Sequence, residues 1–153
     1  MASQRLSCNC QPFVYSLDMK SSFDRKIQEA VDDPTAMRAI VKEGLEIEWF
    51  DDLAKLFGTS GAAFGTIVGI DPRTLTRRRR EGRLTPRESN ALYHLAVLYE
   101  HALDVLGDPE TVRNWLNTPE PDFSDMSPLA LLDTAPGMKE VDHLLGRIEH
   151  GVF

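Results

Sequence analysis

Residues 60–88 read SGAAFGTIVGIDPRTLTRRRREGRLTPRE, and this stretch decides the fold of the 153-residue chain. Ser60 is placed to cap a short helix, and Pro72 is placed to start a second one. Gly69 supplies the turn between them, and Gly65, four positions earlier, lets the two helices cross closely. Two short helices joined by such a turn indicate a helix-turn-helix.

The buried side of this motif is expected to hold four apolar residues, Phe64, Val68, Ile70 and Leu75. The position three after Leu75 is usually apolar in such motifs, but here it is an arginine, Arg78. We expect Arg78 and Arg79 to lie beside the buried side and either to extend toward water or to pair with a carboxylate such as Asp51, Asp52 or Glu88.

Seven arginines gather between positions 72 and 87, although the whole chain has a formal net charge of -7. The second helix of a helix-turn-helix enters the DNA major groove, so its outward face is the candidate DNA-contacting surface. If Leu75 points inward, the rotation of about 100° per residue in an α-helix places four residues on the outward face: Arg73, Thr76, Arg77 and Arg80. The alternative is a solvated basic face or an intramolecular network of ion pairs.

Capping residues followed by proline, and glycines that end apolar runs, predict helices on both sides of this motif. The expected ranges are 22–31, 34–43, 47–57, 85–107, 109–117 and 138–150, with a further helix start at Ser127-Pro128. No alternation of apolar and polar residues is long enough for a sheet, so the chain is predicted to be all-α.

The helix over 85–107 is the longest and the expected scaffold, and its apolar stripe consists of Leu92, Leu95, Ala96, Tyr99, Ala102, Leu103 and Leu106. A second stripe on it, formed by Ala91, Leu98 and Val105, predicts either packing within the chain or a dimer seam. Because helix-turn-helix proteins usually read two half-sites, we expect a homodimer, with this helix or the N-terminal helices as the seam.

The sequence predicts three regions along the chain. Residues 1–32 are expected to form an arm or an extra helix, residues 33–107 the helix-turn-helix region, and residues 108–153 a separate C-terminal domain. The last region holds nine acids and three bases. A segment of that charge would not lie along DNA, so it predicts a second binding activity.

Several classes of protein are excluded by what the sequence lacks. No apolar run reaches the length of a membrane span and no signal peptide is present, so a cytoplasmic protein without a membrane partner is expected. Cys8 and Cys10 are expected to be reduced and unliganded thiols. Histidine pairs seven residues apart are too distant to chelate one metal, and no nucleophile with a base and no phosphate loop is visible. We therefore predict no enzymatic activity, cofactor or metal.

The C-terminal region carries a resemblance to a known family. Residues 115–119 (WLNTP), 127–134 (SPLALLDT) and the run from Gly137 to Phe153 resemble the Xre/MbcA/ParS antitoxin family. The likeness extends upstream through RTL at 73–75, RR at 77–78, GRL at 82–84 and ES at 88–89, and it covers residues 44–153. This spaced pattern is more specific than a helix-turn-helix alone.

The resemblance implies a type II antitoxin whose partner is a RES-domain toxin, an enzyme that depletes cellular NAD. It implies that the C-terminal domain binds the toxin and occludes its active site with the chain end, while an Xre-like helix-turn-helix represses the operon's own promoter at its operator DNA. The resemblance also implies that toxin and antitoxin assemble into a hetero-oligomer. The implied toxin-binding residues are Arg147, Glu149, His150, Gly151, Val152 and Phe153.

Two alternatives remain open on the residues themselves. The chain could be a stand-alone homodimeric helix-turn-helix transcription regulator whose acidic part is a dimerisation or ligand domain. The final helix could also be only the last core helix of a compact domain, with a frayed tail.

Overall fold

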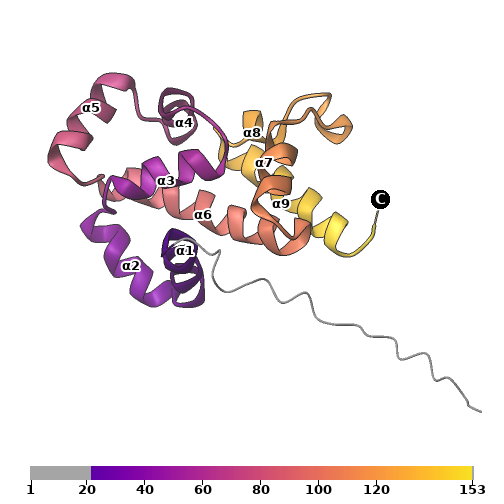
Figure 1. Cartoon of the computed structure of the whole chain (residues 1–153), viewed down its shortest axis with the longest axis horizontal. Coiled ribbons are helices and arrows are strands. Elements are labelled where there is room, and N and C mark those ends of the chain that lie inside the picture. The colour runs from indigo at the N-terminus through magenta and orange to yellow at the C-terminus, as the bar shows by residue number, and fades with distance from the viewer. Residues whose placement is uncertain (1–21, 153) are drawn as a thin grey trace, which may run out of the picture.

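The structure is a computed structural model that describes residues 22–152, and Figure 1 shows it as a cluster of helices. The prediction of an all-α protein is confirmed, because the described residues form α-helices and one 3₁₀ turn with no strand. The elements are α1 Ser22–Asp32, α2 Pro34–Glu43, α3 Glu48–Leu56, α4 Gly61–Val68, α5 Pro72–Glu81, α6 Pro86–Leu106, α7 Pro109–Asn117, η1 Pro121–Phe123, α8 Pro128–Leu131 and α9 Ala135–Glu149. The expectations for residues 1–21, with Cys8 and Cys10, and for Phe153 lie outside the described residues.

The helix starts follow the capping residues that the sequence displays. The side chains of Asp33, Ser60, Asp71, Thr85 and Asp108 each accept a hydrogen bond from a backbone N–H in the first turn. Such bonds satisfy donors that have no partner within the helix.

One predicted capping bond is not formed, and one predicted helix start differs from the structure. Ser127 stands at the N-cap of α8 but makes no side-chain capping bond. The last helix begins at Ala135 rather than at Met138, because the Thr134 hydroxyl accepts from the N–H of Gly137 and Pro136 fits in the first turn.

Helix α6 runs through the middle of the molecule, and most other helices pack against it (Figure 1). Its buried face is the predicted stripe, with Leu92, Leu95, Ala96, Tyr99 and Ala102 all buried. Leu98 of the second stripe is also buried by the chain itself. This burial favours the interpretation in which that stripe packs within the chain.

The core continues across the expected division at residues 107 and 108. A single cluster of buried residues extends from Ile27 on α1 to Leu145 on α9. The C-terminal helices therefore pack on the same scaffold helix as the helix-turn-helix. Within residues 22–152, none of the helices is both long and apolar enough to cross a membrane.

One large apolar residue of α2, Ile40, is exposed. Met37 and Val41 of α2 face the core, whereas 45% of Ile40 is accessible to solvent. Positions four apart lie on one helix face, and Ile40 lies about 100° around the axis from Val41.

The turn of the helix-turn-helix depends on a close approach at Gly65. The N–H of Ile70 donates to the carbonyl oxygen of Gly65 at 2.7 Å, and a Cβ added to Gly65 would lie 2.7 Å from the Ile70 carbonyl oxygen. Gly69 takes the left-handed conformation, with φ of 78°, that the sequence predicts for the turn. Glycine at position 65 is thus required by the backbone of the turn itself.

Replacing Gly65 with alanine is expected to lower the free energy of unfolding by about 1 to 3 kcal/mol, because the new methyl group has to displace backbone. The matched control is Gly146→Ala, at a helical position with nothing within 4 Å of the added Cβ. That change should be neutral or stabilising by up to about 1 kcal/mol. Urea unfolding of both variants measures the difference, and equal stabilities would contradict the interpretation.

Candidate functional site

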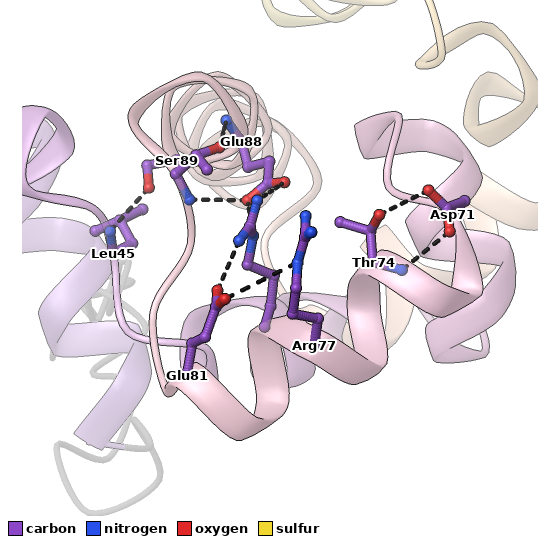
Figure 2. A network of polar contacts seen from close by, with 9 residues as sticks. Leu45, Asp71, Thr74, Arg77, Glu81, Glu88 and Ser89 are labelled. Atoms are coloured by element: carbon purple, nitrogen blue, oxygen red, sulfur yellow. Dashed lines mark hydrogen bonds and ion pairs between the residues drawn. The ribbon is translucent and has the colours of Figure 1, made fainter.

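The N-terminus of α5 is built by Asp71. Its carboxylate accepts from the N–H groups of Arg73 and Thr74 at 3.0 and 2.9 Å, and the Thr74 hydroxyl donates to it at 2.7 Å (Figure 2). These bonds, with the Thr74 N–H first, hold the pKa of Asp71 below its usual value. Leu75, one residue later, is buried and sets the rotation of the helix.

That rotation exposes the four predicted DNA-contacting residues, Arg73, Thr76, Arg77 and Arg80. The Thr76 hydroxyl donates to the Pro72 carbonyl at 2.9 Å, and Arg77 lies 3.9 Å from the exposed carboxylate of Glu81. Neither Arg73 nor Arg80 forms an ion pair with any residue between 22 and 152. This outward face of α5 therefore presents positive charge that the described chain leaves largely unneutralised.

Arg78 points the other way, into a partly buried ion-pair network. Its guanidinium donates to Glu88 on α6 through Nε at 2.8 Å and Nη2 at 3.1 Å, and to Glu81 through Nη1 at 2.6 Å. The side chains of Arg78 and Glu88 are only 12% and 14% exposed. The expected pairing of Arg78 with Glu88 is confirmed, and it explains why an arginine occupies a position where an apolar residue is usual.

The network shifts the pKa values of both partners. Hydrogen bonds to Glu88, and then to Glu81, raise the pKa of the Arg78 guanidinium. Burial raises the pKa of the Glu88 carboxyl, but hydrogen bonds from Arg78 and from the Thr85 N–H outweigh burial, so the pKa falls below its ordinary 4.5. Both groups are therefore charged at neutral pH.

A second ion pair fixes the opposite side of α5. Arg79 donates to Asp51 of α3 at 2.7 Å, one of the expected pairings, with both side chains part exposed. Arg78 and Arg79 thus join α5 to two different helices. They hold the helix in place, while its outward face remains exposed.

The sequence named Ser89 only as part of the family resemblance and did not reveal its structural role, which is a contact with Leu45 (Figure 2). Ser89 is fully buried, and its hydroxyl accepts from the N–H of Leu45 at 2.8 Å. Next to it, Leu84 donates to the Leu45 carbonyl at 2.9 Å, and Ile47 donates to the Gly82 carbonyl at 3.1 Å. No local pattern could identify Ser89, because its partner lies 44 residues away.

At the other end of the chain, α9 buries the predicted core residues Val141, Leu144 and Leu145 and packs Ile148 against them. The helix closes with Gly151 in a left-handed conformation, φ 65°, and with the N–H of Val152 donating to the Arg147 carbonyl at 2.9 Å. This is a Schellman-type end, which orders the chain beyond the last helical residue.

The structure gives the predicted toxin-binding residues different surroundings. Glu149, His150, Gly151 and Val152 are exposed. Arg147 is about half exposed and forms an ion pair with Asp122 at 2.6 Å, so its charge already has a partner in the chain. Phe153 lies outside the described residues.

His101 connects α6 to this end of the chain. Its Nδ1 lies 2.8 Å from Asp142 and its Nε2 lies 3.7 Å from Glu149, both on α9. The side chain is 28% exposed, as expected for a half-buried histidine. Across residues 22–152, no group of three or more histidine, cysteine or acidic side chains is placed to hold a metal.

Comparisons with known proteins cover both ends of the molecule. Residues 36–97 match the profile of the antitoxin Xre-like helix-turn-helix domain, and residues 101–151 match that of the antitoxin Xre/MbcA/ParS C-terminal toxin-binding domain. A protein named Antitoxin Xre from Yersinia enterocolitica serotype O:8 / biotype 1B is 36% identical over 115 residues, which cover 74% of this chain and 78% of that one. Another Antitoxin Xre, from Photorhabdus laumondii subsp. laumondii, is 30% identical over 118 residues, covering 76% and 80%. The chain belongs to the Xre antitoxin family.

This protein is therefore an antitoxin of a toxin-antitoxin system, with a helix-turn-helix domain. Its two matched domains imply DNA and a toxin as partners. The family is not a known family of enzymes. In this antitoxin, α5 with its exposed arginines belongs to the first matched region, and α9 with its exposed end belongs to the second.

Glu88→Gln is expected to lower the free energy of unfolding at neutral pH by about 2 to 3 kcal/mol, because it leaves the largely buried Arg78 charge with only the more exposed carboxylate of Glu81 as a partner. The folded-state pKa of Glu88 lies below the ordinary 4.5, so its contribution to stability is present above that value and is lost as the pH falls through the lower folded-state value. The difference in free energy of unfolding between wild type and variant should therefore become smaller as the pH is lowered.

Urea unfolding at a series of pH values tests this expectation. Glu81→Gln is the matched control, because Glu81 is 48% exposed and should contribute little. A gap that stays constant from neutral pH to below the folded-state pKa would show that the Glu88 charge does not stabilise the fold.

Proposed function

We propose that this antitoxin neutralises a RES-domain toxin that depletes NAD, by covering the toxin's active site with residues 147–153. We further propose that the antitoxin, as a homodimer, represses its own operon through the outward face of α5. One observation carries the proposal. The matched helix-turn-helix domain exposes the arginines of α5, and the matched toxin-binding domain, which lies in the acidic C-terminal region, exposes the end of α9.

Steric occlusion is supported by how α9 ends. Its apolar face is held in the core, and Glu149 to Val152 project as an ordered, exposed end of mixed polarity. A segment that is already ordered loses less conformational entropy when it enters a partner's cleft. Neutralisation of this kind needs no chemistry from the antitoxin itself.

Operator binding is supported by the orientation of α5. Four arginines are consecutive from Arg77 to Arg80, yet Arg78 is turned inward to Glu88 and Arg79 is paired with Asp51. The remaining exposed arginines lie on one face with Arg73. Side chains on one face of a recognition helix can reach the major groove and its phosphates together.

The first test is truncation of the chain end. Ile148 packs against the core and Arg147 pairs with Asp122, so a deletion should begin beyond them. Deleting residues 150–153 is expected to leave the melting temperature within a few degrees of wild type and to abolish rescue of cells that express the RES-domain toxin of the same operon.

The matched control is deletion of residues 1–21, which lie outside both matched domains and should not affect rescue. Rescue by the C-terminal truncation at wild-type expression would contradict occlusion by the chain end. Failure of the full-length antitoxin to bind the toxin would instead favour a stand-alone transcription regulator.

The second test is the salt dependence of binding to operator DNA. Replacing Arg73, Arg77 or Arg80 with glutamine should weaken binding, and removing one phosphate-binding arginine should reduce the slope of log K against log salt by about 1. Arg38→Gln, an exposed arginine on α2, is the control and should leave the slope unchanged. Fluorescence anisotropy over a salt series measures both quantities, and a wild-type affinity independent of salt would exclude phosphate binding.

A further inference from the structure

The segment between α7 and α8, residues 118–127, forms a tight loop with a fixed shape. Phe123 anchors it in the core with only 7% of its surface exposed. Backbone bonds close it: Glu120 donates to the Met126 carbonyl at 3.0 Å, and Asp125 donates to the Glu120 carbonyl at 3.1 Å. The loop is therefore ordered by its own contacts.

The tip of this loop has an unfavourable backbone. Ser124 and Asp125 both have positive φ, 55° and 62°, and they are the only residues other than glycine with positive φ between residues 22 and 152. Such conformations cost on the order of 1 kcal/mol each for side chains of this kind. The fold retains two in succession.

The strained tip presents an apolar side chain to solvent. Met126 follows it directly and is 47% exposed. Exposure of a large apolar side chain does not help a monomer, whereas a flexible thioether adapts well to a partner's pocket. Met126 is thus available for a contact that the chain does not make by itself.

The loop is joined to the end of α9 through Arg147. The Arg147 guanidinium pairs with Asp122 of the loop at 2.6 Å, and the Arg147 carbonyl accepts from the N–H of Val152 at 2.9 Å. Val152 is 59% exposed. Arg147 therefore contacts the loop through its side chain and the chain end through its backbone.

We propose that the 118–127 loop and the end of α9 form one continuous toxin-binding surface in which Met126 is an apolar anchor. The inference rests on the proposed function, because it takes the toxin as the occupant. The loop lies within the residues that match the toxin-binding domain. It carries the acids Glu120, Asp122 and Asp125, so the surface fits a protein that presents an apolar pocket within a basic rim.

The test uses the full-length antitoxin and the purified RES-domain toxin of the same operon. Met126→Ser should raise the dissociation constant of the complex at least about 10-fold, the effect expected when an interface anchor is truncated. Met126→Leu, which retains the apolar volume, should stay within about 3-fold of wild type. Because Met126 is exposed, the melting temperatures of both variants should match that of wild type.

Ile40→Ser on α2 is the matched control, since Ile40 is 45% exposed and lies outside the proposed surface. It should leave toxin affinity unchanged. Wild-type affinity in Met126→Ser, or an equal reduction in Ile40→Ser, would overturn the role of Met126 while leaving toxin binding by the antitoxin intact. Absence of binding by the wild-type protein would instead overturn the proposed function itself, and the anchor with it.

Discussion

The carboxylate of Glu88 joins α5, which carries the exposed arginines, to α6, against which most of the other helices pack. It accepts from the N–H of Thr85, which completes the capping box of α6, and from the guanidinium of Arg78, which fixes α5. A buried pair of charges stabilises a fold only when its hydrogen bonds are well satisfied. Here the carboxylate accepts one backbone bond and two guanidinium bonds, and Glu81 accepts from the remaining side of Arg78. The orientation of the outward face of α5 therefore depends on the ion pair between Arg78 and Glu88.

Most of the fold was predictable because the chain marks its helix boundaries with local chemistry. Aspartate, serine or threonine followed by proline or a small residue begins helices, and Gly44, Gly69, Gly82 and Gly107 follow the ends of four of them. These signals act over a few residues, so they can be read without knowing the fold. The burial of Leu75 was predictable for the same reason, and the outward placement of the arginines follows from helical geometry alone.

What the sequence could not provide was long-range contact. Ser89 and Leu45 are 44 positions apart, and nothing near either one indicates the other. The sequence gives no sign of the ion pair between Arg147 and Asp122 either. From the sequence alone, Arg147 was expected to interact with the toxin, but in the structure its charge already has a partner within the chain. The exposure of Met126 was also unpredictable, since it depends on two residues with positive φ that are neither glycine nor asparagine. Sequence patterns therefore predicted helices and their buried faces better than they predicted the contacts of individual side chains.

The acidic character of the chain is compatible with the basic outward face of α5, because the negative and positive regions lie far apart along α6. Arg78 is attached to α6 at Glu88, while the end of α9 approaches α6 at His101, thirteen residues further along. That separation is about 20 Å along a helix axis, or roughly two Debye lengths at physiological salt. The field of the C-terminal acids is therefore largely screened at α5. A protein with a formal net charge of -7 can in this way carry a locally positive face and a distant acidic one, each suited to its own partner.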